Sequence, residues 1–129
     1  MLRLVRTALT FPGPPPVRAL ADVDLDIPRG DFVAIEGPSG GGKSTLLNVL
    51  ALLHRPESGR YEIDGQDVAR LDDAGRAALR SDRFAYVFQS FHLLDHRPAI
   101  DSAALGLLYR GVPRADREAR ARAALQRLG

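Results

Sequence analysis

The 129-residue sequence has no cysteine, no tryptophan and a single lysine among its 18 basic residues. The absence of cysteine excludes disulfide bonds, thiolate metal sites and cysteine nucleophiles. No stretch approaches the roughly 18 consecutive apolar residues that can span a membrane. The opening residues MLRLVRT also lack the continuous apolar segment of a secretory signal. We therefore expect a soluble chain. Because it has no disulfide bonds, it is compatible with a reducing compartment.

The chain's charges nearly balance, with 18 basic and 16 acidic residues, and its hydrophobic content is 45%. This composition is typical of one globular domain. Residues 110–129 are locally basic, with six arginines and two acids, but they contain no aromatic side chain. A nucleic-acid surface combines basic groups with stacking aromatics. We therefore interpret this tail as a solvated helix and expect no nucleic-acid partner.

Two kinds of strand pattern occur along the chain. From Asp22 to Ile27 apolar and charged residues alternate, which predicts a strand with one exposed face. FVAIE (32–36) and FAYVF (84–88) are short apolar runs, which predict strands buried on both faces. Another short strand is expected over residues 2–7, and PGPPP (12–16) predicts a rigid connection.

Helices are expected in four places, from their periodicity and their terminal signals: residues 43–53, 72–82, 100–109 and 113–129. Pro56 and Gly59 end the first of them, and His54 is expected to be a solvated helix end. The Asp64–Gly65 pair predicts a hairpin turn. The order is therefore a β-rich start, an α/β centre and a helical end.

The segment GPSGGGKS fits the phosphate-loop pattern G-x-x-x-x-G-K-[ST], and it lies between an apolar run and an expected helix. Glycines let backbone N–H groups approach phosphate oxygens, because no Cβ atoms intervene. The helix that follows directs its positive end toward the same anion. The predicted phosphate-binding residues are Gly37, Pro38, Ser39, Gly40, Gly41, Gly42, Lys43, Ser44 and Thr45.

The lone lysine falls on the one position where the pattern requires it. An ammonium is a compact charge on a flexible stem, so Lys43 can reach the β- and γ-phosphates, whereas a guanidinium is wider and needs a forked partner. The Ser44 hydroxyl suits Mg²⁺. The sequence thus predicts a nucleotide-phosphate site, which a kinase, a GTPase and a transport ATPase would share.

The flanks of this loop distinguish among these classes. DLDIPRGDFVAIEGPSGGGKSTLLNVLALLHRPESGRYEIDGQDV, followed by LRSDRFAYVFQSFHLL, resembles the ATP-binding subunit of ABC transporters, and most of all the ATPases paired with macrolide-export or lipoprotein-release permeases. The resemblance runs over residues 2–129. It implies an α/β P-loop NTPase core with an antiparallel β subdomain and the start of a helical subdomain, incomplete at the C-terminus. The implied division is an antiparallel part (1–31), a core that ends at the Q loop (32–89) and a helical part (90–129).

The same resemblance implies roles for residues outside the phosphate loop. The family's Q loop falls on Gln89, whose amide would meet Mg²⁺ and the attacking water, so Ser44 and Gln89 are the implied metal contacts. The aromatic residue that stacks on adenine falls on Phe11, with Val17 beside it. The segment from Ser90 to His96 would face a membrane partner. ATP and Mg²⁺ are the implied cofactors.

The implied partners are a transmembrane permease and a second ATP-binding subunit, arranged head to tail. The implied location is cytoplasmic, peripheral to the inner face of the cell membrane. The sequence has no LSGGQ-type signature, no Walker B segment and no switch histidine, so we expect no turnover by this chain alone. Two alternatives stay open, namely a truncated or degenerate ATP-binding module and a different P-loop enzyme such as a small-molecule kinase.

The stretch Phe91–His96 imitates two other motifs. Phe91–Asp95 has the outline of a Walker B strand, but His92 interrupts its apolar run. His92, Asp95 and His96 approximate the H-x-x-E-H metalloprotease pattern, with Asp in place of Glu, but the stretch lies outside the expected helices. The Q-loop interpretation already explains the stretch, so we expect neither motif to act here.

Overall fold

A computed structural model describes residues 1–90 and 94–128. These residues form two compact units, Met1–Ala77 and Ala78–Gly129. Phe91, His92, Leu93 and Gly129 lie outside the described residues. The expectations for Phe91–Asp95, for the H-x-x-E-H resemblance and for the Ser90–His96 segment therefore fall partly on residues without a structural description.

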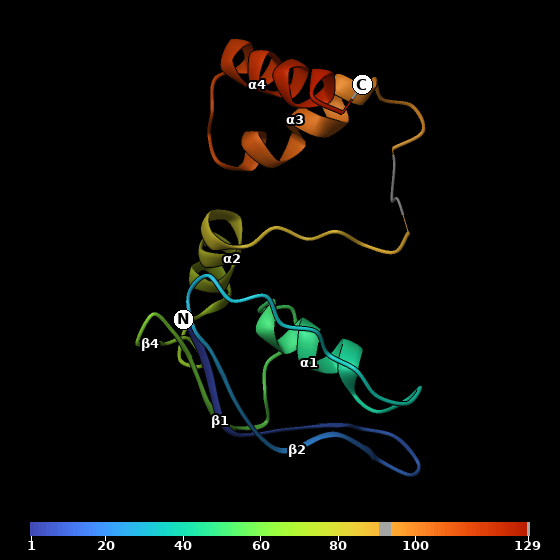
Figure 1. Ribbon diagram of the computed structural model, residues 1–129, viewed down its shortest axis with the longest axis vertical. Helices are drawn as coiled ribbons and strands as arrows, with labels where there is room; N and C mark the ends of the chain where they lie inside the picture. The colour runs from blue at the N-terminus through green and yellow to red at the C-terminus, as the bar shows by residue number, and fades with distance from the viewer. Residues whose placement is uncertain (91–93, 129) are drawn as a thin grey trace. The chain divides into compact units, whose positions relative to one another are not determined.

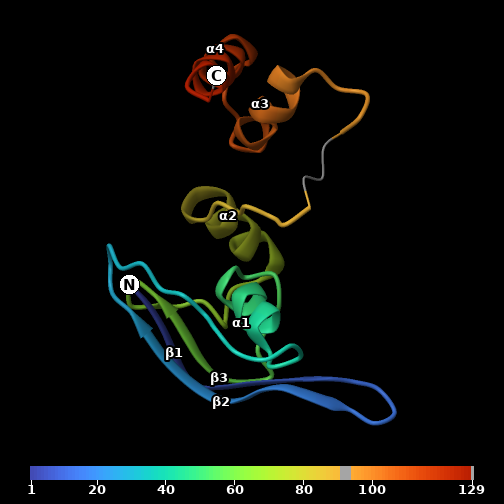
Figure 2. The ribbon, with the colours of Figure 1, turned by 45° about the vertical axis from the view of Figure 1, so that its right-hand side comes forward.

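The first unit is built on an antiparallel sheet (Figures 1 and 2). Its spatial order is β2 (Val17–Ile27), β1 (Leu2–Phe11), β3 (Ser58–Ile63) and β4 (Gln66–Asp67). The alternation predicted from Asp22 to Ile27 is confirmed, because the three aspartates are exposed and the apolar residues between them are partly buried. The turn predicted at Asp64 and Gly65 joins β3 to β4.

The β1–β2 hairpin is longer than the sequence pattern indicated. Leu4 pairs with Leu25 near one end of the two strands, and Phe11 pairs with Val17 at the other. The proline-rich connection 12–16 follows directly on this last pair. Because proline lacks a backbone N–H group, the connection cannot extend the ladder and the hairpin ends there.

One helix, α1 (Lys43–Leu50), covers a face of this sheet, as Figure 2 shows. Val49 and Tyr61 of β3 are almost fully buried between the helix and the sheet. The Tyr61 hydroxyl donates a hydrogen bond of 2.6 Å to the backbone oxygen of Leu50, at the C-terminal end of α1. Burial of a large apolar side chain stabilises the fold by about 1.5–3 kcal/mol. The helix that follows the phosphate loop is thus fixed to the sheet through its far end.

The turn after α1 is held by a buried arginine from α2 (Asp73–Arg83), a helix that the sequence predicts. Arg76 is only 3% exposed. Its Nη2 atom donates to the backbone oxygens of Leu52 and His54, at 2.8 and 3.0 Å. A cation suits the C-terminal end of a helix, where carbonyl groups lack intrahelical partners. Arg76 therefore joins the beginning of α2 to the end of α1.

The second unit contains the two remaining helices that the sequence predicts, α3 (Ala99–Tyr109) and α4 (Arg114–Gln126). Each begins directly after a proline, Pro98 or Pro113. Proline suits the start of a helix because the first N–H groups have no intrahelical partner. Ala104 of α3 and Ala121 of α4 are buried where the two helices pack together.

The two strands expected at residues 32–36 and 84–88 are absent from the described structure, so these predictions are wrong for this chain as it stands. Phe32 is 97% exposed and Val87 is fully exposed. A strand forms only where a neighbouring strand accepts and donates its ladder of hydrogen bonds. No described residue pairs with either segment, so both keep a non-regular backbone with apolar side chains in solvent.

We expect these two exposed segments to make the purified 129-residue chain self-associate. Unpaired backbone and contiguous apolar side chains favour contact with another copy. Sedimentation velocity at micromolar concentration should show oligomers. The charged variants Phe32→Asp and Val87→Lys should shift the distribution toward the monomer, because each removes apolar surface that packs against nothing. A monomeric wild type would contradict this expectation.

Candidate functional site

The phosphate-loop residues and the end of the β1–β2 hairpin enclose one cavity of about 330 Å³ in the first unit. Of the twelve predicted site residues, all but Gly37, Pro38 and Gln89 line it. Its lining consists of Phe11, Val17, Ala19, Ser39, Gly40, Gly41, Gly42, Lys43, Ser44 and Thr45. Residues more than 30 positions apart in the sequence thus meet around one space. Ala19 is the one lining residue that neither the motif nor the family resemblance indicated.

Backbone geometry explains why glycine is needed at the end of the loop. Gly42 has φ of 78° and stands directly before α1. A Cβ atom on Gly42 would collide with the backbone oxygen of Ala19. The loop therefore passes so close to β2 that no side chain fits between them. No sequence pattern could indicate Ala19, because its contribution is a backbone atom that any residue would supply.

The lysine side chain folds back across its own loop. The Nζ atom of Lys43 donates to the backbone oxygens of Gly37 and Pro38, at 2.9 and 2.6 Å. The two remaining phosphate-loop residues thus contact the lysine, although they do not line the cavity. Within the described part of the chain, no carboxylate forms an ion pair with Lys43. Its positive charge is therefore held by neutral acceptors and stays available to an anion.

The start of α1 adds to this positive character. The helix begins at Lys43 and has no acidic residue in its first turn. The first N–H groups of a helix lack intrahelical partners and carry the positive end of its dipole. Ser44 and Thr45 bring hydroxyl groups to the same turn. The cavity therefore combines backbone donors, an ammonium and hydroxyls around a space suited to an anion.

The opposite side of the cavity is apolar. Phe11 and Val17 are cross-strand partners at the end of the hairpin, and both are partly exposed. They provide an accessible apolar surface next to the polar loop. One side of the cavity offers hydrogen-bond donors and positive charge, and the other offers apolar side chains. Such a cavity suits a ligand that carries both phosphates and an aromatic ring.

His54 differs from its expected role as a solvated helix end. Its side chain is partly buried, and its ring lies against Phe11, with ring centroids 5.5 Å apart and an interplanar angle of 79°. The two residues are 43 positions apart in the chain, so no local pattern could indicate the contact. The tight turn after α1 brings them together.

Gln89 belongs to the second unit, where it lies exposed at a bend. The residues before it, Phe84, Tyr86 and Phe88, form a stack of rings with successive centroid distances of 6.4 and 5.9 Å. Burial in this stack raises the pKa of Tyr86. The role expected for Gln89 at a magnesium ion stays a prediction.

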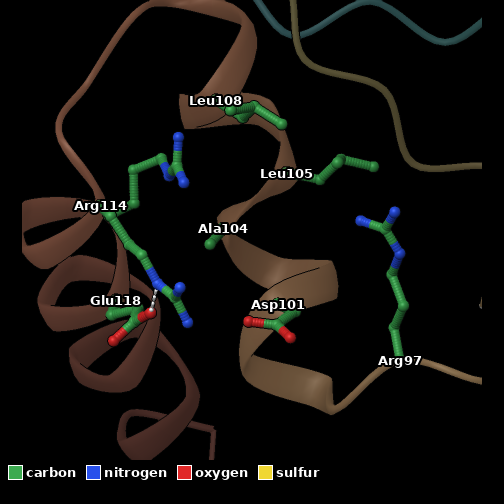
Figure 3. Close-up of a pocket in the computed structure, with 8 residues that line it drawn as sticks. Arg97, Asp101, Ala104, Leu105, Leu108, Arg114 and Glu118 are labelled. Carbon is green, nitrogen blue, oxygen red and sulfur yellow. Dashed lines mark hydrogen bonds and ion pairs between the residues drawn. The ribbon is translucent and has the colours of Figure 1, made fainter.

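A second cavity, of about 210 Å³, lies between α3 and α4 (Figure 3). Its lining consists of Arg97, Asp101, Ala104, Leu105, Leu108, Arg114, Arg117 and Glu118. Arg114 donates from Nε to the Oε1 atom of Glu118 at 2.6 Å, and this hydrogen bond holds the pKa of Glu118 below its ordinary value. The cavity is thus lined by five charged and three apolar side chains, and arginines outnumber acids among them.

Among residues 1–90 and 94–128, no cluster of three or more His, Asp or Glu side chains is arranged to hold a metal ion. In the same residues, no helix is long and apolar enough to cross a membrane. A metal at the first cavity would therefore depend on other oxygen ligands, among which the phosphate-loop motif points to the Ser44 hydroxyl.

Comparison with known proteins gives matches over the whole chain. A family model described as "ABC transporter" matches residues 20–129. The macrolide export ATP-binding/permease protein MacB 1/2 of Paracoccus denitrificans is 47% identical over 130 residues, which cover 100% of this chain and 20% of that protein. The pyoverdine export ATP-binding/permease protein PvdT of Pseudomonas aeruginosa is 46% identical over 99% of this chain and 19% of its own length. The chain thus spans about a fifth of the length of these curated relatives.

A solved structure with the same fold is the dimeric ATP-binding cassette MJ0796 in a post-hydrolysis state, bound to ADP and Pi. It matches with a TM-score of 0.88 and 35% sequence identity, over 98% of this chain and 56% of that one. This match confirms the predicted fold class, a partial α/β P-loop domain with an antiparallel sheet and helices.

Proposed function

Because the chain belongs to the ABC transporter family, we propose that its first cavity binds the triphosphate and base of ATP for a transport ATPase. The observation that carries this proposal is the convergence of the phosphate loop and the Phe11–Val17 pair around one cavity. That cavity offers donors and positive charge on one side and an apolar surface on the other.

The phosphate side fits a nucleotide in three respects. The loop approaches β2 so closely that a Cβ atom at Gly42 has no room, which leaves backbone donors uncovered. The Lys43 ammonium is already positioned within the loop by two carbonyl oxygens. The first turn of α1 adds N–H groups and no competing acid. Lys43 would exchange its carbonyl partners for the β- and γ-phosphates, to which a cation binds more strongly.

Mg²⁺ belongs to the same proposal. The Ser44 hydroxyl is a hard oxygen ligand in the first turn of α1, and Gln89 would add an amide oxygen. When bound with ATP, Mg²⁺ neutralises charge on the phosphate oxygens. Two protein ligands are enough for a Mg²⁺ site, because Mg²⁺ usually keeps several waters and binds substrate oxygens as its other ligands.

The base of the nucleotide would lie on Phe11, with Val17 next to it. A planar base gains from stacking on an aromatic side chain, and this contact needs an accessible ring face. Phe11 is 36% exposed, so its ring is available on the cavity side. The loop would then bind the phosphates and the end of the hairpin would bind the base, within one cavity.

A membrane permease and a second ATP-binding subunit are the proposed partners. The relatives MacB 1/2 and PvdT are ATP-binding/permease proteins, and the matching solved cassette is a dimer. The proposed contact region for the permease is the segment from Ser90 to His96, and the proposed location is the inner face of the cell membrane. The division into parts 1–31, 32–89 and 90–129 belongs to the same proposal. No observation favours a small-molecule kinase.

Thermal unfolding tests the ligand class. Mg-ATP and Mg-tripolyphosphate should both raise the melting temperature of the chain, because a ligand that binds only the folded state stabilises it by about 2.7 kcal/mol at 100 times its Kd. Adenosine, which lacks the phosphates, should give little protection. Protection by adenosine without protection by tripolyphosphate would contradict phosphate binding at this loop.

A further inference from the structure

The ring of Phe11 is in contact with a second ring from a distant part of the first unit. Phe11 lines the candidate nucleotide cavity. His54, in the turn after α1, meets Phe11 nearly perpendicularly, at a centroid distance of 5.5 Å. An edge-to-face arrangement at this separation is a favourable geometry for two aromatic rings. His54 does not line the cavity itself, so it contacts the Phe11 ring from outside the cavity.

Hydrogen bonds at His54 and at the next residue, Arg55, hold the backbone that carries the His54 ring. The His54 N–H group donates to the backbone oxygen of Asn48 at 3.1 Å, and its own oxygen accepts from the buried Arg76 at 3.0 Å. The next residue, Arg55, donates to the Leu71 backbone oxygen at 3.2 Å and to Asp73 at 2.8 Å. The turn is thus attached to both α1 and the beginning of α2.

This turn also holds a strained residue. Leu52 has φ of 59° and is almost fully buried. A leucine is unfavourable in the left-handed region, and such residues persist where the surroundings determine the backbone. The Leu52 oxygen accepts from Arg76 at 2.8 Å. The strained conformation and the buried arginine together set where the His54 ring lies.

We propose that His54 is a positioning residue for nucleotide binding, because it holds the Phe11 ring ready to stack on the base. This inference rests on the proposed function and adds to it a residue outside the cavity. A partly exposed phenylalanine has rotamer freedom that stacking would remove, and a neighbour that fixes the ring beforehand lowers this entropic loss. His54 therefore contributes to base binding and not to phosphate binding.

The test compares a ligand that has a base with one that has none. For His54→Ala in the full chain, the affinity for Mg-ATP should fall by about two- to twelvefold, the range given by loss of one aromatic pair. The affinity for Mg-tripolyphosphate should not change. His54→Phe, which keeps an aromatic ring at the position, should restore most of the ATP affinity. A melting curve of each variant establishes that it is folded.

A double-mutant cycle separates contact with Phe11 from a general effect. In a Phe11→Leu background, His54→Ala should cause no further loss of ATP affinity, because the ring it positions is gone. Unchanged ATP affinity in His54→Ala would overturn the inference. An equal loss for ATP and tripolyphosphate would also overturn it, since His54 would then act on the fold as a whole. If the wild type bound neither ligand, the proposed function itself would fail.

Discussion

Lys43→Ala should weaken Mg-ATP binding by about 100-fold or more. The substitution removes the one lysine of the chain, whose ammonium lies within the loop that the phosphates would enter. A hydrogen bond to a charged group contributes about 1.5–3 kcal/mol, and Lys43 would make more than one. Equilibrium dialysis with labelled ATP measures the loss. Lys43→Arg should also bind weakly, because a planar guanidinium does not fit among the carbonyl groups of the loop.

The control for this experiment is Arg70→Ala. Arg70 is an exposed cation that pairs with Asp67, away from the lining of the cavity. Its loss removes the same formal charge, so a general electrostatic effect would appear in both variants. Equal ATP affinity in wild type and Lys43→Ala would show that the phosphate-loop motif is not used for binding.

Hydrolysis by the 129-residue chain should be close to the uncatalysed rate. The chain has the phosphate loop, Lys43, the Ser44 hydroxyl and Gln89. Its sequence has no Walker B acid, no catalytic glutamate and no LSGGQ-type loop. Phosphoryl transfer depends on positioning of the water and on neutralisation of the developing charge. One positioned acid–base group contributes about 10²- to 10⁴-fold, so the joint loss should leave no measurable turnover.

A phosphate-release assay on purified chain measures this rate, with Lys43→Ala to reveal any contaminating ATPase. Multiple turnover that disappears in Lys43→Ala would refute the incomplete-site interpretation. Asp95 and His96 would then be the first residues to replace, since Asp95 belongs to the stretch that imitates a Walker B strand. Both are exposed in the structure.

Local patterns predicted most of the regular structure correctly. The alternation from Asp22 to Ile27 correctly predicted a strand with one exposed face, because a strand in a sheet with a single covered face needs that period. Pro113, the first residue of the range predicted for the last helix, lies directly before α4. The phosphate-loop motif predicted residues that the structure places around one cavity, since a glycine loop followed by a helix is a short-range feature.

The errors concern interactions between distant residues. The apolar runs at 32–36 and 84–88 have the composition of buried strands, but composition does not supply the neighbouring strand that would complete a ladder. His54 has the local surroundings of a solvated helix end, yet a strained turn and Arg76 place it against Phe11. Both outcomes depend on tertiary contacts that no window of the sequence contains.

We propose that the loop from Gly37 to Thr45 forms a nucleotide site with Phe11 and Val17. Isothermal titration calorimetry of the wild-type chain with Mg-ATP tests it most directly. We expect saturable binding of one nucleotide per chain, and competition by Mg-tripolyphosphate for the same site. Absence of binding heat across a range of temperatures, from a chain that shows a cooperative melting transition, would contradict it.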